Sequence, residues 1–386
     1  MQNLLKIKKK DKIENPFTSS GKKNSFFSQK FLPSNPLSPK FNNAHQKNYP
    51  TAMKIPTRIL SGAALFAVAL TSAYSQTATT KPVGYRTEVI KGGNVFNLLS
   101  PNLDNAVGAS GTFESAAGAV LTDDQGTFTT AFTAGTALTL KITSGANAGI
   151  TQDVTAFTAT TVTTGQDISG LVTAGTSYEL RATPTVASLF GATNSAGLLG
   201  SASNSNTADL IWIPNGDGTY TRIFYSTGGI QGTGWRAPGI ASTDRGATPI
   251  AITDAVFVQR KGTTDLSVVF TGHVQTTATK AAVVNGFNPV SRVIPVGITL
   301  AQSQLETELT QSASNSNTAD LIWNPTGTGN YDRYFYSNGG IQGTGWRSPG
   351  IASTDRGSVV LNSGYLIQRK GNSTNVTLRL PTGLDL

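Results

Sequence analysis

The sequence predicts an all-β protein with sandwich- or barrel-like domains and an internal duplication of about 110 residues. Short β-branched or alternating runs indicate the strands, for example LTLKITSG, SYELRAT and VTLRLPTG. Each run ends in a turn-forming or small polar residue, and such spacing is typical of sandwiches and barrels. Helix signals are scarce. The exception is Ser303–Ser312, where Leu305, Leu309 and the acids of the first turn predict one short helix.

The duplication is visible as a repeated block. Ser201–Gly246 aligns with Ser312–Gly357 without gaps, and 38 of the 46 positions are identical. After a slip of two residues, VFVQRKG at Val256–Gly262 matches YLIQRKG at Tyr365–Gly371. This period is far longer than the 20–50 residues of solenoid repeats, so it predicts two domain-sized units.

The differences between the two copies predict a β-hairpin. Six of the eight differences fall at every second residue from 213 to 223, whereas Trp212, Tyr220 and Phe224 recur unchanged. Alternation with period two indicates an extended chain with two unlike faces. The PNGDG segment between the flanks has strong turn chemistry. We expect the three aromatic residues to pack toward one layer and the variable residues to face outward.

The positive charge of the chain is confined to its beginning. The whole chain has 30 basic and 21 acidic residues, a formal charge of +9. Twelve of the basic and two of the acidic residues precede Gln76, which leaves 18 basic and 19 acidic residues after it. A basic protein usually suggests nucleic acid or an anionic membrane as partner. Because the rest of the chain is close to neutral, we expect no nucleic-acid partner.

Residues 53–75 have the order of regions found in a secretory signal peptide. MKIPTR supplies a positive start, Ile59–Leu70 is an apolar run, and Ala73-Tyr74-Ser75 is a small-x-small ending. The apolar run is shorter than the ~20 residues that span a bilayer. The alternative is a buried helix of a longer domain. We expect a secreted protein, extracellular or associated with the cell surface, without a transmembrane segment in the mature chain.

Four further segments complete the predicted organisation. Residues 1–52 are rich in Lys, Asn, Ser and Pro, which predicts disorder. They either lie upstream of the true start at Met53 or form an unusually long leader. An N-terminal β-region is expected over 76–185, repeat unit 1 over 186–296 and repeat unit 2 over 297–386. The chain has no cysteine, so disulfides and thiolate metal sites are excluded.

From Pro82 to the C-terminus the sequence resembles an uncharacterised paralogous family of secreted β-rich proteins of verrucomicrobia-type bacteria. The matching features are Pro82-Val83-Gly84-Tyr85, the Ile142–Arg181 block that ends in AGTSYELR, the ADLIW…GWR block and the late VQRKG strand. The second copy at Ser312–Leu386 departs from the family pattern and leaves the number of domains open. The resemblance implies export and β-structure, and it implies no catalytic residues.

The stretch GGIQGTGWR occurs at Gly228–Arg236 and again at Gly339–Arg347. Its glycines do not follow the G-x-G-x-x-G order and no Walker-type lysine is near, so neither a nucleotide nor another cofactor is expected. One interpretation is a loop with positive φ at several glycines that seats its tryptophan on a sheet. The other is an exposed tryptophan platform for sugar rings. The candidate ligand-binding residues of the second interpretation are Trp235, Arg236, Asp244, Trp346, Arg347 and Asp355, with Tyr225 and Tyr336 as further contact aromatics.

No metal site is expected. Asp217 in NGDG has the residue type of a calcium ligand, but the second copy has Thr328 at that position. We therefore expect Asp217 to be a turn residue.

Catalytic residues are not expected either. Asp244-Arg245 and Asp355-Arg356 recur, as do Asp209 and Asp320, and such aspartates could supply a glycosidase carboxylate pair. An aspartate next to an arginine is more often a solvated or structural ion pair. His273 is the only histidine after residue 75 and has no equivalent in the second copy. No G-x-S-x-G or H-E-x-x-H motif occurs.

These observations predict a secreted, non-enzymatic structural or adhesive β-protein of the cell surface. The alternatives are an extracellular carbohydrate-binding module and a glycoside hydrolase or lyase. The expected partners are a polysaccharide, another cell-surface component, or a second copy of the chain that pairs through exposed strand edges.

Overall fold

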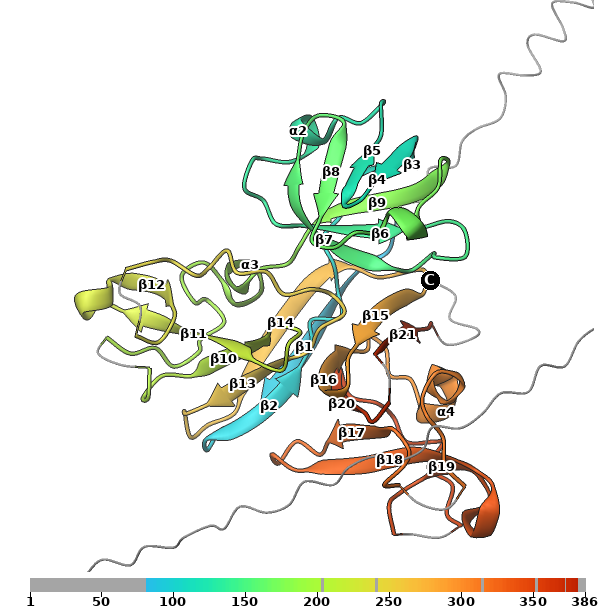
Figure 1. Cartoon of the computed structure of the whole chain (residues 1–386). Helices are drawn as coiled ribbons and strands as arrows, with labels where there is room; N and C mark the ends of the chain where they lie inside the picture. Colours follow the sequence, from blue (N-terminus) through green and yellow to red (C-terminus); the bar gives the residue numbers. More distant parts are fainter. Residues whose placement is uncertain are drawn as a thin grey trace, which may run out of the picture. The chain divides into compact units, whose positions relative to one another are not determined.

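The computed structural model describes residues 81–380 except 203–204, 240–241, 314–315, 351–352 and 372. The predicted upstream segment 1–52 and the signal peptide 53–75 lie outside the described residues. The described chain is all-β, which confirms the predicted fold class (Figure 1). Its α-helices are short: α2 (Phe128–Ala131), α3 (Val186–Phe190) and α4 (Leu300–Ser303).

A seven-stranded antiparallel sheet curls into a nearly closed barrel. Its strands, in spatial order, are β3 (Val107–Phe113), β9 (Thr176–Ala182), β6 (Leu138–Ile142), β7 (Thr151–Phe157), β8 (Thr161–Thr164), β5 (Val120–Thr122) and β4 (Ser115–Ala117). Bulges interrupt the β3–β9 and β7–β8 ladders. Because a bulge bends its strand and increases the twist, these interruptions help the sheet to curl. The barrel has its own core, which includes Phe113, Leu140 and Leu180.

A five-stranded and a two-stranded sheet form the first β-sandwich. The large sheet contains, in order, β12 (Thr233–Arg236), β11 (Tyr220–Thr227), β10 (Leu210–Pro214), β13 (Val256–Arg260) and β2 (Val95–Leu99). The small sheet pairs β1 (Val83–Ile90) with β14 (Leu266–His273). Ile211, Ile223 and Val258 of the large sheet share one core with Ile90 and Phe270 of the small sheet.

The second β-sandwich repeats this arrangement. Its large sheet contains, in order, β19 (Thr344–Arg347), β18 (Tyr331–Asn338), β17 (Leu321–Pro325), β20 (Gly364–Arg369) and β16 (Gly286–Ser291). The small sheet pairs β15 (Thr279–Val283) with β21 (Thr374–Leu378). The two copies of the repeated block therefore occupy equivalent places in two sheets of equal strand order. The duplication itself stays a prediction from the sequence.

Asn97 and Asn288 show that the edge strands β2 and β16 are equivalent as well. The Asn97 Nδ2 group donates to the carbonyls of Lys91, Val95 and Val258 at 3.0–3.3 Å. The Asn288 Nδ2 group donates to the carbonyls of Val284, Gly286 and Ile367 at 2.8–3.1 Å. Strand pairing thus places 83–99 with the first sandwich and 279–291 with the second, and the barrel follows β2 and precedes α3 in the chain. The predicted ranges 76–185, 186–296 and 297–386 divide the chain differently.

The hairpin prediction is confirmed for the backbone and for the shared layer of Trp212, Tyr220 and Phe224, and it is wrong for the variable face. β10 and β11 pair antiparallel, and the turn is closed by Asn215 N donating to Thr219 O at 3.0 Å. Yet the variable residues Ile213 and Ile223 are buried in the sandwich core, and Trp212 lies on the opposite face. The prediction failed because both faces of this sheet carry apolar clusters, so alternation did not distinguish protein from solvent.

The helix expected over Ser303–Ser312 is also wrong. α4 ends at Ser303, because Gln304 takes a left-handed conformation with φ 54°, and one 3₁₀ turn follows at Leu305–Thr307. Leu305 and Leu309 are nevertheless buried. Their packing into the second sandwich overrides the weak helix propensity of this short segment.

Candidate functional site

The two GGIQGTGWR loops have the same conformation, and their glycines take positive φ values as predicted. Gly229 and Gly340 begin a 3₁₀ turn in each loop, at φ 70° and 68°. A Cβ atom on Gly229 would lie 2.2 Å from the carbonyl oxygen of Ala202, and one on Gly340 would lie 2.3 Å from that of Ala313. Glycine is therefore required here by the backbone conformation and by the lack of space.

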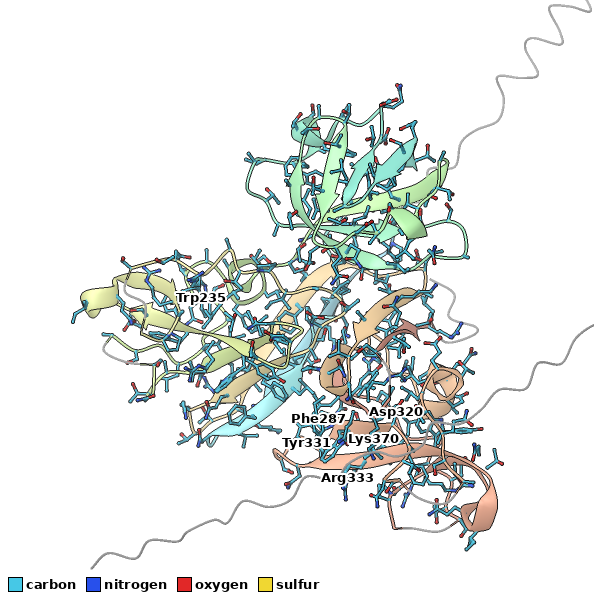
Figure 2. The ribbon with its side chains drawn as sticks, in the orientation of Figure 1. Trp235, Phe287, Asp320, Tyr331, Arg333 and Lys370 are labelled. Carbon is cyan, nitrogen blue, oxygen red and sulfur yellow. The ribbon has the colours of Figure 1, made fainter. Side chains whose placement is uncertain are left out.

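Trp235 and Trp346 are buried, with exposed fractions of 1% and 2% (Figure 2 labels Trp235). The exposed tryptophan platform is therefore wrong, and the interpretation of a tryptophan seated on a sheet is confirmed. The reason is that β12 and β19 direct these side chains into the sandwich cores. There Trp235 makes an edge-on contact with Tyr225, at 5.2 Å between ring centroids, and Trp346 makes one with Tyr336 at 5.5 Å.

The arginine that follows each tryptophan holds its loop together. The Arg236 guanidinium donates to the carbonyls of Gln231, Thr233 and Trp235 at 2.7–2.9 Å, and to Asp244 Oδ2 at 2.8 Å. Its side chain is only 8% exposed. A ligand could bind this guanidinium only by breaking bonds that define the loop, so Arg236 acts as a structural residue.

Arg347 and Asp355 repeat this arrangement in the second loop. Arg347 donates to the carbonyls of Gln342, Thr344 and Trp346, and to Asp355 Oδ1 at 3.1 Å. The Asp355 side chain is 64% exposed and that of Asp244 is 61% exposed. Of the six candidate ligand-binding residues, the two aspartates are thus the ones that reach solvent.

The residue that each loop presents to solvent is its isoleucine. Ile230 and Ile341 are 95% and 96% exposed, more than any other large hydrophobic residue among those described. Sequence reasoning passed over them in favour of the tryptophans. The available signal was that isoleucine is the one aliphatic side chain within the nine residues that recur without change.

The recurring aspartates Asp209 and Asp320 have structural partners. Asp209 is 1% exposed, pairs with Arg260 and accepts the backbone N–H groups of Leu199 and Lys261. Asp320 pairs with Arg369 at 2.8 Å in the same way. These bonds satisfy the two carboxylates, so Asp209 and Asp320 form structural ion pairs with arginines distant in sequence. Asp244 and Asp355 pair with Arg236 and Arg347, and not with the arginines that follow them in the sequence.

Two further candidates also have local roles. Asp217 is a turn residue as predicted, since its Oδ1 accepts the Thr219 N–H at 2.9 Å and the Thr219 hydroxyl at 2.6 Å. His273 ends β14 and exchanges backbone hydrogen bonds with Asp104. The Asp104 carboxylate accepts a hydrogen bond from Gln275 Nε2 at 2.8 Å.

The outer face of each large sheet carries an aromatic cluster. In the second sandwich Trp323 contacts Phe287 and Tyr331, and the Arg333 guanidinium lies 5.3 Å from the Trp323 ring centroid. Figure 2 labels Phe287, Tyr331 and Arg333. In the first sandwich Trp212 has the equivalent arginine at 5.2 Å. Leu98, Ala255 and Leu366 form one buried cluster, to which both sandwiches contribute, and it covers part of the outer face of each large sheet. Trp323 packs against this shared cluster, whereas Trp212 packs within its own sandwich against Ala208, Leu210 and Phe224.

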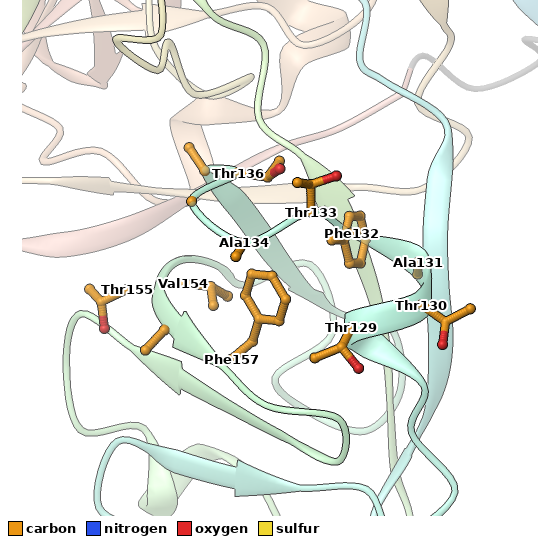
Figure 3. A pocket seen from close by; sticks show the side chains of 13 residues that line it. Thr129, Thr130, Ala131, Phe132, Thr133, Ala134, Thr136, Val154, Thr155 and Phe157 are labelled. Atoms are coloured by element: carbon orange, nitrogen blue, oxygen red, sulfur yellow. The ribbon is translucent and has the colours of Figure 1, made fainter.

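Clefts are present in the barrel, away from the predicted site residues. One cleft of about 710 Å³ lies between residues 129–137 and 154–157 (Figure 3). A second cleft of about 430 Å³ is lined by β3, by residues 125–128 and by Asp123 and Tyr178. No sequence pattern pointed to these positions, because the residues that line the clefts are spread over separate segments of the chain.

No protein-family model, curated protein or solved structure matches the chain. No helix in the described part of the chain is long and apolar enough to cross a membrane. Within the same residues, no three His, Cys, Asp or Glu side chains are grouped so that they could hold a metal ion.

Proposed function

We propose that this chain is a non-enzymatic structural or adhesive protein that acts outside the cell and makes contact through its two GGIQGTGWR loops. The observation that carries the proposal is the exposure of Ile230 and Ile341, 95% and 96%, at equivalent places in the two sandwiches. An aliphatic side chain so far from any core contributes little to folding. Its energetic value lies in contact with another apolar surface.

The construction of the loops supports a contact role. Four hydrogen bonds from Arg236 fix the first loop, so little conformational freedom is lost when its tip docks. Burying an isoleucine side chain contributes about 1.5–3 kcal/mol. The Arg236 guanidinium is buried and paired with Asp244, so its charge is compensated within the loop. These properties favour an apolar partner surface over a charged one.

The expected export fits this role. The predicted signal peptide, the near-neutral remainder of the chain and the absence of cysteine agree with a secreted protein that depends on packing and hydrogen bonding for stability. The satisfied carboxylates of Asp209 and Asp320 support a non-enzymatic role.

The test compares adsorption of the protein to alkyl-coated and hydroxyl-coated surfaces in a quartz crystal microbalance. We expect the Ile230→Ser/Ile341→Ser protein to lose most of its preference for the alkyl surface. Val269→Ser is the matched control, because Val269 is also exposed, at 55%, but lies on β14. Equal adsorption of the double variant and the native protein would refute the role of the loops.

A further inference from the structure

We propose that the seven-stranded barrel binds a neutral saccharide in the 710 Å³ cleft beside α2 (Figure 3). This inference is independent of the loops and concerns a different part of the molecule. The cleft lies within the volume range of about 300–1,000 Å³ that is usual for small-molecule sites. It is bounded on one side by α2 and the turn after it, and on the other side by the end of β7.

The walls of the cleft determine the charge of the ligand. None of the thirteen described residues that line it carries a charge. A charged ligand would lose hydration here without gaining a counter-charge, which is costly. The ligand is therefore neutral.

Aromatic side chains form the apolar part of the cleft. Phe157 contacts Phe132 edge-on, at 6.3 Å between ring centroids, and Figure 3 shows the Phe157 ring inside the cleft. A bulge between Val154 and Ala156 shifts the register of β7, so that Val154 and Phe157 both pack against the barrel core. Phe132 is fixed against Gly108, where a Cβ atom would lie 2.5 Å from its ring. The C–H face of a sugar ring suits such a flat apolar surface.

Threonine hydroxyls form the polar part. Thr129, Thr130, Thr133 and Thr136 line the cleft, and none of the four side chains makes a hydrogen bond to another described residue in the structure. Each hydroxyl can both donate and accept. A purely apolar ligand would cover these groups without pairing them, whereas a saccharide pairs with them through its own hydroxyls.

A second cleft of about 430 Å³ lies near the start of α2 and is lined in part by residues 125–128. It is lined by the buried Asp123 and Tyr178, whose hydroxyl donates to Asp123 Oδ2, and by Gly111 of β3. A Cβ atom at Gly111 would lie 2.3 Å from Asp123 Oδ2, so glycine is required for the close packing of β3 against this carboxylate. Asp123 Oδ1 accepts from Gln125 N at 2.9 Å and Oδ2 accepts from Tyr178, so the buried carboxylate is satisfied within the protein. Its negative charge disfavours anionic polymers near the barrel clefts, in agreement with a neutral ligand.

The experiment measures binding of the full chain to a panel of neutral and anionic polysaccharides by affinity electrophoresis, and to their oligosaccharides by calorimetry. The expected result is binding to at least one neutral polymer and to its oligosaccharides. The Thr133→Val/Thr136→Val protein keeps its shape and loses two hydroxyls, and we expect its Kd to rise roughly tenfold. Phe157→Ala should weaken binding at least as much.

Two controls separate this site from other effects. Thr87→Val changes an exposed threonine on β1, outside the barrel, and the Ile230→Ser/Ile341→Ser protein changes the loops. Both should bind the saccharide as the native protein does. The inference is overturned if no neutral polysaccharide binds, if anionic polymers bind more tightly, or if the threonine double variant binds with unchanged Kd. Loss of binding in the isoleucine variant alone would also overturn it and would place the site in the loops.

Discussion

Substitution of Gly229 by alanine tests whether the GGIQGTGWR loop is shaped by its glycines. The added Cβ would lie 2.2 Å from the Ala202 carbonyl oxygen, at a residue with φ 70°. The matched control is Gly216→Ala in the hairpin turn, where φ is 81° and nothing lies within 4 Å of the added atom. Both substitutions force an alanine into the left-handed region, but only the first also creates an overlap.

The expected magnitudes follow from these two effects. The left-handed conformation costs an alanine about 1–2 kcal/mol. Displacing a packed neighbour adds about 1–3 kcal/mol. We therefore expect Gly229→Ala to lower the free energy of unfolding by about 3 kcal/mol and Gly216→Ala by about 1 kcal/mol. The second sandwich offers the same comparison, with Gly340→Ala against Gly327→Ala.

Urea unfolding followed by tryptophan fluorescence measures the difference. All four tryptophans of the chain lie in the two sandwiches and none lies in the barrel, so the signal reports on the sheets that carry the loops. If Gly229→Ala and Gly216→Ala lost the same free energy, the contact with Ala202 would not constrain the loop, and the reasoning would be refuted.

Three other predictions follow from the structure and the sequence. Trp235→Phe should lower the free energy of unfolding, measured by thermal unfolding, by about 1 kcal/mol more than Trp346→Phe does. The reason is that Trp235 Nε1 donates to Gly191 O at 3.0 Å, whereas Trp346 Nε1 is buried and has no hydrogen-bond partner among the described residues. Equal losses of free energy would contradict this. Burial lowers the pKa of Lys141 from 10.5 to about 8 in the folded protein. Between pH 8 and pH 10.5 the unfolded chain therefore binds more protons than the folded chain. The contribution of Lys141 to the free energy of unfolding rises with pH over this range, by about 3 kcal/mol in total. Lys141→Met should remove this rise. The free energy of unfolding is measured by urea titration at pH 7 and pH 10 for the native and the Lys141→Met protein, and an equal change between the two pH values in both proteins would refute the prediction. If the signal peptide is cut as predicted, mass spectrometry of exported protein should find Gln76 at the N-terminus, and an N-terminus upstream of Met53 would contradict the proposed export.

Parts of the fold could be predicted from local sequence because their causes are local. The PNGDG turn follows from residues that favour positive φ and side-chain capping, and the structure has Asn215 bonded to Thr219 across it. The positive φ values of Gly228–Gly234 follow from glycine density in the same way. Period-two alternation identified β10 and β11 as strands, because successive side chains of a strand point to opposite faces.

The candidate site was predicted less well, because exposure depends on the whole sheet. A tryptophan among glycines is consistent with an exposed platform or a buried anchor, and the pairing of β11 with β12 decides for burial of Trp235. The 3₁₀ turn between these two strands presents Ile230 to solvent. The barrel clefts could not be predicted at all, since Phe132 and Phe157 are separated in sequence and meet only through the curl of the sheet.

The sequence by itself determined that the chain is built of short strands, that a block recurs with nearly the same residues, and that glycine shapes its loops. These properties depend on neighbours within a few residues. Only the tertiary structure decided that β1 and β2 complete the first sandwich, that the barrel follows β2 in the chain, and which aromatic residues are buried. Those outcomes depend on hydrogen bonds between strands more than 150 residues apart, such as β2 and β13, and no local pattern encodes the partner of an edge strand.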